Sequence, residues 1–457
     1  MKTIILNLCL IILMLPQFTY GQLSISGEIT PTAMFRISNG SLIDLPFRLG
    51  NISVNYALGD FELVTNTAIE TRWENPEFSE EMLQFREAYL TWYPSFGELK
   101  LGKMIHAWGA ADANNPTDNL SPYDYYYMFL SGTDRKIGSQ GVAGKIYIGD
   151  AQVELVALPQ FEPNRFPLNE PEFPIQIPVP EGVHYFYPEN EFEFGSRVQY
   201  ALGIGDISAS YFKGNDRSFS PVGLEIDIAP LFMGGAPSFT SHLTYRETDV
   251  MGLDVVLFPG NWTFRGEFAY FRTKTPEIDH SMSKFSYDAE YIQSVFQIEY
   301  AFANTVQLMG QLISNNTQSL NSTLVKDANL NMLLGMVQDT SLHSLDPYRA
   351  LLASQLPQAP QPFSAGMGTP FAMISDQVVM LSSMATLLDN SLELSGMLMI
   401  NLAETGYMTS LGSSYAVMEG LSLDATLGYF IGGEEEGNRF KELEDFSNMN
   451  LGLTYSF

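Results

Sequence analysis

The last ten residues of the chain, Asn448-Met449-Asn450-Leu451-Gly452-Leu453-Thr454-Tyr455-Ser456-Phe457, alternate strictly between small or polar and apolar side chains. Successive side chains of a β-strand point to opposite faces, so this segment predicts a strand with one apolar and one polar face. Strands of about ten residues with this alternation are typical of barrels that cross a membrane with one face towards lipid and one towards a wet lumen. The segment therefore favours a transmembrane barrel.

Four further segments alternate in the same way. Within residues 421–430, Leu421 and Leu423 share one face, while Ser422 and Asp424 share the other. The remaining segments are residues 262–271, 291–300 and 391–402. Repetition of one amphipathic strand pattern predicts an all-β fold, a transmembrane antiparallel up-and-down β-barrel.

Short turn signals and long segments alternate along the chain. The short signals are Gly59-Asp60, Ser95-Phe96-Gly97, Gly149-Asp150, Gly203-Ile204-Gly205, Pro259-Gly260-Asn261, Asn304, Asp389-Asn390 and Glu419-Gly420. The long segments are residues 110–137, 162–189, 215–238, 274–287, 315–371 and 432–445. Short periplasmic turns and longer extracellular loops are the asymmetry of outer-membrane barrels, and these turns predict about 18 strands, or about 16 if weak segments merge.

The N-terminus predicts export. Lys2 precedes an apolar run over residues 4–15, Pro16 ends the run, and Thr19-Tyr20-Gly21 has the small-residue character of a cleavage site. We expect residues 1–21 to be a signal peptide and residues 22–457 to be one barrel domain. The only cysteine, Cys9, lies in the signal peptide, so the mature chain would have no disulfide, thiolate metal site or cysteine nucleophile.

The charge of the chain excludes some partners. Removing residues 1–21 leaves 22 basic residues (23 minus Lys2) and 52 acidic ones, a net charge of −30. So acidic a chain is not expected to bind nucleic acid. Aromatic residues reach 13% and hydrophobic residues 45%, which a disordered acidic chain would lack. The expected partners are outer-membrane lipid and a small hydrophilic solute, and no cofactor is expected.

The polar faces of the predicted strands supply a candidate pore lining. Charged residues are costly against lipid but ordinary against water, so we place them towards the lumen. The candidates are Glu28, Glu62, Glu70, Arg72, Glu98, Lys100, Lys145, Glu154, Glu193, Arg197, Arg265, Glu267, Glu299, Glu393 and Asp424. Acids outnumber bases, which predicts a cation preference. The alternative is that these charges pair across strands and only keep the lumen wet. Around Arg86 and Lys103 the alternation fails, which predicts a β-bulge.

Residues 83–122 resemble a known family. They contain Arg86-Glu87-Ala88-Tyr89, then Leu99-Lys100-Leu101-Gly102-Lys103, Trp108-Gly109 and Asn115-Pro116. This series resembles alginate-export-type barrels and related porins, which implies an outer-membrane channel of about 18 strands. The predicted lining is acidic, whereas export of a polyanion needs a basic lumen, so alginate itself is not the expected solute. The terminal Phe457 resembles the signal read by the barrel-assembly machinery, a further expected partner.

Two loop segments carry possible functional residues. Asp112, Asn114, Asp118 and Asp124 could supply oxygen ligands to calcium, or could cap turns, as Asn and Asp often do. In the long loop 315–371, leucines at positions 330, 333 and 334 and Val337 recur at helical spacing. Asp346-Pro347 would start a second helix through Leu356. We expect this partly helical loop to fold into or over the lumen as a gate.

A porin-like channel for small hydrophilic solutes is the function that these features predict. One alternative is a surface-binding or adhesion barrel whose acidic loops are the active part. Another is a lipid-hydrolysing barrel, in which His106 would be the histidine to test. No histidine of the chain lies in a G-x-S-x-G context, so we expect no enzyme activity.

Overall fold

The computed structural model describes residues 21–457 except 75–82, 113, 131, 175–181, 234, 304, 340, 342–355, 361, 374 and 436–437. The predicted signal peptide therefore lies outside the described residues apart from Gly21. None of the helices in the described part of the chain is long and apolar enough to cross a membrane.

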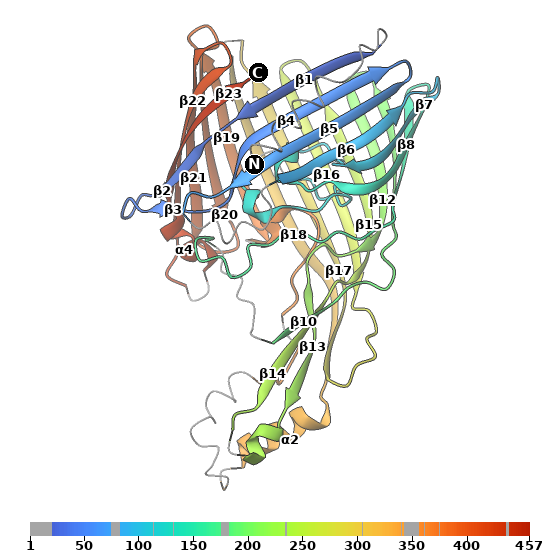
Figure 1. Cartoon of the computed structure of the whole chain (residues 1–457), viewed down its shortest axis with the longest axis vertical. Coiled ribbons are helices and arrows are strands. Elements are labelled where there is room, and N and C mark those ends of the chain that lie inside the picture. Colours follow the sequence, from blue (N-terminus) through green and yellow to red (C-terminus); the bar gives the residue numbers. More distant parts are fainter. Residues whose placement is uncertain are drawn as a thin grey trace, which may run out of the picture.

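The chain forms a closed antiparallel β-barrel of 18 strands, as predicted (Figure 1). Each wall strand pairs with the next wall strand along the chain. β1 and β2 together form the first wall strand, and both pair with the last strand, β23, which closes the barrel. The wall strands are β1 (Gln22–Ile29) with β2 (Thr32–Arg36), β4 (Phe47–Leu58), β5 (Phe61–Thr71), β6 (Leu83–Trp92), β7 (Gly97–Met104), β8 (Ser139–Ile148), β9 (Ala151–Leu158), β11 (Glu193–Leu202), β12 (Gly205–Asn215), β15 (Glu247–Leu257), β16 (Trp262–Lys274), β17 (Ser283–Ala301), β18 (Val306–Val325), β19 (Gln377–Leu387), β20 (Leu392–Asn401), β21 (Gly406–Met418), β22 (Leu421–Gly432) and β23 (Asn448–Ser456).

The smaller elements lie in the connections at the long-loop end. They are β3 (Leu42–Ile43), β10 (Val183–Phe186), β13 (Ser220–Asp227), β14 (Ser238–Thr244), α2 (Ala328–Gln338) and α4 (Arg439–Glu442), with 3₁₀ turns η2 (Tyr125–Tyr127), η3 (Gly132–Arg135), η4 (Ala229–Met233), η6 (Pro370–Met373) and η7 (Glu444–Phe446).

The short turns lie where the sequence predicts them. Gly59, Gly149 and Gly420 have positive φ angles of 59°, 59° and 75°, as tight hairpin turns require. Asp389 and Asn390 adopt the same left-handed region, with φ of 55° and 69°. Asn304 lies outside the described residues, but β17 and β18 pair on either side of it. These turns lie at one end of the barrel and the long loops at the other.

The outer face of the barrel is apolar and exposed. In β23 and the residue after it, Met449, Leu451, Leu453, Tyr455 and Phe457 are 40–52% exposed, and they are the residues that alternation placed on one face. Such a belt extends around the wall and is far larger than the apolar patches of soluble monomers. It is the lipid-facing surface of a transmembrane barrel.

The predicted β-bulge lies at Arg86. Asn66 of β5 pairs with Glu87, whereas the next residue, Thr67, pairs with Phe85, so Arg86 is the extra residue on β6. Phe85 is 56% exposed on the lipid side, while Arg86 is 8% exposed and hydrogen-bonds Thr133 O inside the barrel. The bulge thus turns a cation into the lumen that strict alternation would not place there.

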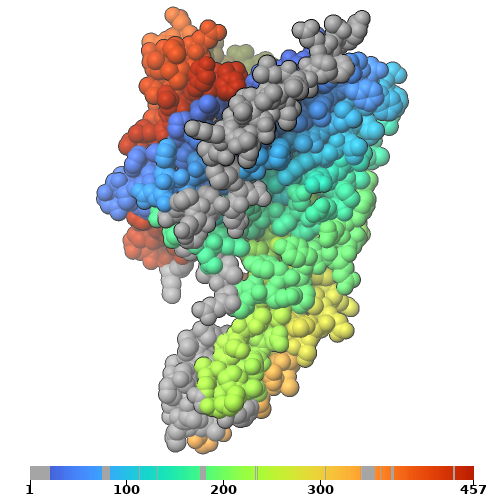
Figure 2. All heavy atoms as spheres, viewed as in Figure 1, coloured from blue at the N-terminus to red at the C-terminus, as the bar shows by residue number. Residues whose placement is uncertain are grey.

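A separate body projects beyond the barrel at the long-loop end (Figures 1 and 2). We call it the protrusion: β10, β13, β14, α2 and the outer ends of β17 and β18. β17 has 19 residues and β18 has 20, which is far more than a membrane crossing needs. β13 pairs with the start of β17 and with β14, and β14 pairs in parallel with β10.

Three predicted loops are therefore wrong in their bounds. Segment 215–238 contains β13, segment 274–287 contains the start of β17, and segment 315–371 begins with eleven residues of β18 up to Val325. The outer part of β17 does alternate, but its apolar residues Phe285 and Tyr287 are buried while its polar neighbours are mostly exposed, the reverse of a lipid-facing strand. In β18, residues 316–323 are exposed on both faces, so the alternation of a membrane strand is absent there.

The predicted helix over Leu330–Val337 is confirmed as α2. Leu330 and Leu333 are fully buried and pack with Ile226 in a small core of the protrusion. Asp327 caps the helix: its carboxylate accepts hydrogen bonds from Leu330 N at 2.9 Å and from the Ser283 hydroxyl at 2.7 Å. The second predicted helix, from Asp346 to Leu356, falls almost entirely outside the described residues.

Asp327→Ala should loosen α2 without disturbing the barrel. Loss of an N-cap costs about 1 kcal/mol, so amide exchange in α2 should accelerate by about fivefold. Hydrogen exchange followed by mass spectrometry measures this for peptides covering residues 328–338. Asp288→Ala removes an exposed aspartate of β17 and should leave α2 unchanged; equal acceleration in both variants would contradict the capping role.

Candidate functional site

Two loops fold from the long-loop end into the lumen. The first inner loop comprises residues 105–138, between β7 and β8, and the second inner loop comprises residues 362–373, before β19. A third segment, residues 161–173, packs beside them, although the sequence predicted an extended extracellular loop there. Its Phe173 is buried in the same core as Tyr125 of the first inner loop. Together these segments narrow the barrel.

Glu267 of β16 anchors the first inner loop to the opposite wall. One of its oxygens accepts hydrogen bonds from the backbone N–H groups of Ala110 and Ala111, both at 2.6 Å. The other accepts from the Thr117 hydroxyl at 2.8 Å. Glu267 is only 4% exposed. Hydrogen bonds to a carboxylate are about twice as strong as neutral ones, so this contact fixes the loop in place.

A row of polar side chains extends the anchor across three strands. Arg265, Gln297 and Gln311 lie opposite one another on β16, β17 and β18. Arg265 donates to Ala110 O at 2.8 Å, and Gln311 donates to Asp112 O at 3.0 Å. Gln297 accepts from Asp112 N at 3.0 Å. Side chains alternate between the two faces of each strand, and all three of these residues lie on the inner face. The register of β16, β17 and β18 places them next to one another.

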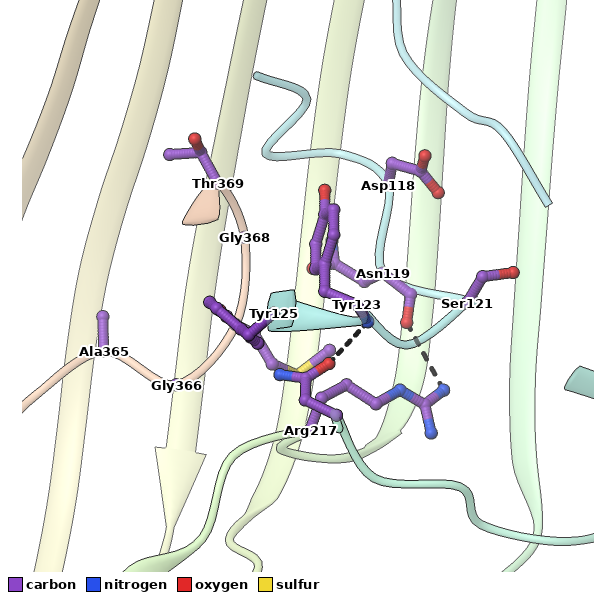
Figure 3. Close-up of a pocket in the computed structure, with 12 residues that line it drawn as sticks. Asp118, Asn119, Ser121, Tyr123, Tyr125, Arg217, Ala365, Gly366, Gly368 and Thr369 are labelled. Carbon is purple, nitrogen blue, oxygen red and sulfur yellow. Dashed lines mark hydrogen bonds between the residues drawn. The ribbon is translucent and has the colours of Figure 1, made fainter. Parts of the chain in front are cut away.

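The two inner loops meet in the lumen (Figure 3). Thr369 donates to the Asn114 side chain at 2.7 Å, and Asn114 donates to Gln311 at 2.8 Å. Gln293 of β17 holds the second loop by accepting from Thr369 N and donating to Met367 O. The cavity left between the loops is about 10 Å³, which is room for about one water molecule.

Arg217 joins the wall to the inner segments (Figure 3). It follows β12 and donates to Leu120 O of the first inner loop and to Glu162 O, both at 3.0 Å. Its guanidinium also forms an ion pair with Glu193 of β11 at 2.6 Å. Both side chains are at most 4% exposed. A buried pair of this kind leaves an uncompensated charge when one partner is removed.

Three larger cavities border the inner loops. One of about 340 Å³, the basic cavity, is lined by five cations and Asp124: Arg48, Arg86, Lys103, Lys136 and Arg165. One of about 380 Å³ is mixed in charge and includes Lys100, Lys145, Arg197 and Glu154. One of about 400 Å³ is lined by serines of β19–β21 with Glu299 and Asp112. The basic cavity was missed in the sequence because its cations come from separate elements: the ends of β4 and β7, the bulge on β6 and two loops. Only the irregular alternation at Arg86 and Lys103 hinted at it.

Thirteen of the fifteen predicted lining residues have an exposed apolar neighbour in the chain and so lie on the inner side of the wall. The other two, Arg265 and Glu299, also lie inside, because Arg265 donates to Ala110 O of the first inner loop and pairs with Glu299. Leu423 is 51% exposed beside Asp424, and Leu394 is 38% exposed beside Glu393. Several of these lining residues form ion pairs with a residue of opposite charge. The pairs are Glu70–Arg165, Arg72–Glu170, Glu98–Lys145, Glu193–Arg217, Arg197–Asp254 and Glu299–Arg265. Glu154 accepts a hydrogen bond from Trp108.

Six of the ten predicted lining acids form no ion pair among the described residues. Two of them, Glu154 and Glu267, accept hydrogen bonds from the first inner loop, and the other four do not contact this loop through a hydrogen bond. Glu28, Glu62, Glu393 and Asp424 make no ion pair with the described residues within 4.0 Å; Glu62 accepts from the Tyr93 hydroxyl and Asp424 from the Thr454 hydroxyl. Glu62, Glu393 and Asp424 each lie within a few residues of a short turn. The uncompensated negative charge is therefore mostly at the short-turn end.

The four calcium candidates are not gathered into one site. Asp112 pairs with Arg265 at 3.1 Å, Asp118 with Lys136 at 2.7 Å and Asp124 with Arg165 at 3.1 Å. Asn114 bridges the two inner loops as described above. Each of the three aspartates is already paired with a lysine or arginine side chain, which favours a structural role for these residues over calcium binding.

His106 does not have the surroundings of a catalytic base. Its Nε2 is buried without a hydrogen-bond partner in the described structure, and the Ser121 hydroxyl accepts from the backbone N–H of His106 instead. Burial, together with the positive charge of Lys136, lowers the pKa of His106 to about 3. The ring is neutral, but in the described structure its Nε2 makes no hydrogen bond to the hydroxyl of a serine, as a triad requires.

Comparison with known proteins bears on the fold. No family model matches the chain, and no curated protein matches its sequence. The structure is similar to outer membrane protein opdK from Pseudomonas aeruginosa, with a TM-score of 0.50 and 8% identity over 95% of this chain and 99% of that chain. A BenF-like porin from Pseudomonas fluorescens gives a TM-score of 0.48 and 9% identity over 96% and 98%. The chain thus has the fold of a Gram-negative outer-membrane β-barrel of the porin type.

Proposed function

We propose that the protein is a passive channel for small hydrophilic solutes. The observation that carries the proposal is a closed barrel whose inner face is polar and whose lumen is narrowed by loops anchored to the wall. Barrels of 16–18 strands are wide enough to enclose an aqueous channel. Loops pinned by Glu267 and Arg217 would set the size of what passes. The second inner loop, the inward part of the predicted 315–371 gate, is the segment we expect to move.

The charge distribution supports a modest cation preference. Four of the ten predicted lining acids, Glu70, Glu98, Glu193 and Glu299, are neutralised by arginine or lysine, which is in part the alternative that the sequence left open. Glu62, Glu393 and Asp424 are not, and rings of acids favour cations. The basic cavity beside the first inner loop would attract anions and so reduce the preference for cations. The preference should therefore be weaker than the net charge of −29 suggests.

Single-channel recording in planar bilayers under a salt gradient tests both statements. We expect steady conductance steps and a reversal potential on the cation side. The variant Glu62→Gln/Glu393→Gln/Asp424→Asn should move the reversal potential towards zero, because it removes uncompensated lumen charge. Glu247→Gln, a substitution on the outer face of β15 at the long-loop end, should leave the reversal potential unchanged. Absence of steps would refute the channel; anion selectivity of the unmodified protein would refute the cation preference.

A second function, binding of a surface partner, is favoured by the protrusion. It has its own core and stands clear of the barrel at the long-loop end, which is extracellular in outer-membrane barrels. Absence of current in the bilayer recording would favour this second function. The resemblance of residues 83–122 to alginate-export-type barrels and the engagement of Phe457 by the barrel-assembly machinery stay predictions.

A further inference from the structure

Three of the five histidines of the chain lie together in the protrusion. His184 comes from β10, His242 from β14 and His280 from the segment between β16 and β17. A single carboxylate, Glu225 of β13, lies among them. These residues are far apart in the sequence, and only the pairing of β10, β13 and β14 brings them together.

The arrangement of Glu225, His242 and His280 has the geometry of a set of metal ligands. The Nε2 atoms of His242 and His280 each lie 3.3 Å from the same oxygen of Glu225. The potential ligand atoms of the three residues all lie within 4.8 Å of one another, and no other group in the described residues meets this condition. In a tetrahedral zinc site with bonds of about 2.0–2.1 Å, neighbouring ligand atoms are about 3.3–3.4 Å apart.

We propose that Glu225, His242 and His280 bind a divalent transition-metal ion, with zinc as the best fit. Two imidazoles and one carboxylate are a ligand set that zinc accepts, with water in the fourth position. Glu225 is 50% and His280 41% exposed at their side chains, so the ion can enter from solvent. His242 forms the inner side of the site, at 3% exposure.

The state of His242 supports metal binding rather than packing alone. Its Nδ1 is buried and has no hydrogen-bond partner in the described structure, so the ring is not held in place by a full set of hydrogen bonds. The one hydrogen-bond contact of the ring in the described structure is that of its Nε2 with Glu225, and Nε2 is the atom that would bind the ion. The alternative is an aromatic cluster in which His242 stacks on Phe186, with ring centroids 5.3 Å apart.

The bound ion would fasten the protrusion together. Glu225 and His242 belong to one hairpin, whereas His280 belongs to the connection that enters β17. An ion shared by these segments would tie the hairpin to the arm formed by β17 and β18. We therefore expect zinc to slow amide exchange in residues 238–244 and 276–283 and to leave the barrel strands unaffected.

Isothermal titration of the chelator-treated full-length barrel in detergent with zinc chloride tests the site. We expect one saturable equivalent per chain. Glu225→Gln and His280→Asn should each weaken binding by tenfold or more, since both side chains are partly exposed and their replacement leaves the fold intact. Glu247→Gln removes an acid from the same end of the barrel outside the site and should bind zinc as the unmodified protein does.

Cobalt provides a second readout that packing cannot imitate. Co²⁺ in the site should give the visible absorption of tetrahedral nitrogen and oxygen coordination, lost in both variants. Zinc binding that is absent, or that persists unchanged in both variants, would overturn the proposal, and so would a Co²⁺ spectrum of the hydrated octahedral ion. Conductance does not enter this test, so the channel proposal stands or falls separately.

Discussion

Glu267→Ala should release the first inner loop and increase the current through the barrel. The substitution removes the common acceptor of the Ala110 and Ala111 amides and of the Thr117 hydroxyl. Hydrogen bonds to a charged group contribute about 1.5–3 kcal/mol each, so losing even two of these three raises the population of the displaced loop by about 100-fold or more. Single-channel recording should show larger, noisier steps than in the unmodified protein.

Glu267→Gln is the matched control for this experiment. The amide oxygen of glutamine keeps an acceptor for the two backbone N–H groups while removing the charge. Its steps should stay close to those of the unmodified protein. If the alanine variant instead conducts like the glutamine variant, the first inner loop does not limit the current, and the constriction lies elsewhere.

Arg217→Met should destabilise the barrel by about 3–5 kcal/mol, the cost of breaking a buried ion pair by removal of one partner. Glu193 would be left fully buried without its cation, and the carbonyl groups of Leu120 and Glu162 would lose their donor. The free energy of unfolding can be measured by guanidinium titration of the protein folded in lipid vesicles.

A double-mutant cycle separates the pair from the carbonyl contacts. Glu193→Gln/Arg217→Met removes both charges and should recover part of the lost stability, because no uncompensated carboxylate remains. Purely additive effects of the two substitutions would show that Glu193 and Arg217 do not stabilise one another. The remaining loss in the double variant measures what Arg217 contributes by holding the inner segments.

The strands of the barrel wall could be predicted from the sequence, whereas the loops that fold into the lumen and their contacts could not. Alternation alone places Leu451 outside and Glu267 inside, because lipid and water demand opposite side chains on each strand. The partners of Glu267 lie about 150 residues earlier, on a loop without periodicity. Nothing local in residues 105–138 indicates that they cross the lumen. The sequence left open that lumen charges pair across strands, but for the same reason it could not indicate that Glu70 and Glu193 pair with Arg165 and Arg217 outside the strands.

The same limit applies to the protrusion. The helical spacing of Leu330 and Leu333 predicted α2, since a helix buries one face wherever it lies. The outer part of β17 was predicted to be a loop because its apolar residues are buried instead of facing lipid, and that of β18 because both of its faces are exposed. The site formed by His242 and His280 has no spacing motif at all, since its ligands come from three separate segments.

The length of β17 and β18 makes them a mechanical connection. Twenty residues of β18 extend roughly 65 Å at about 3.3 Å per residue, from the periplasmic turn to the tip of the protrusion. On its outer part β17 carries Ser283, which bonds the cap of α2, and farther in it carries Gln293 and Gln297, which hold the two inner loops. A force applied to the tip of the protrusion is therefore transmitted along β17 and β18 to the strand residues that hold the two inner loops in the lumen.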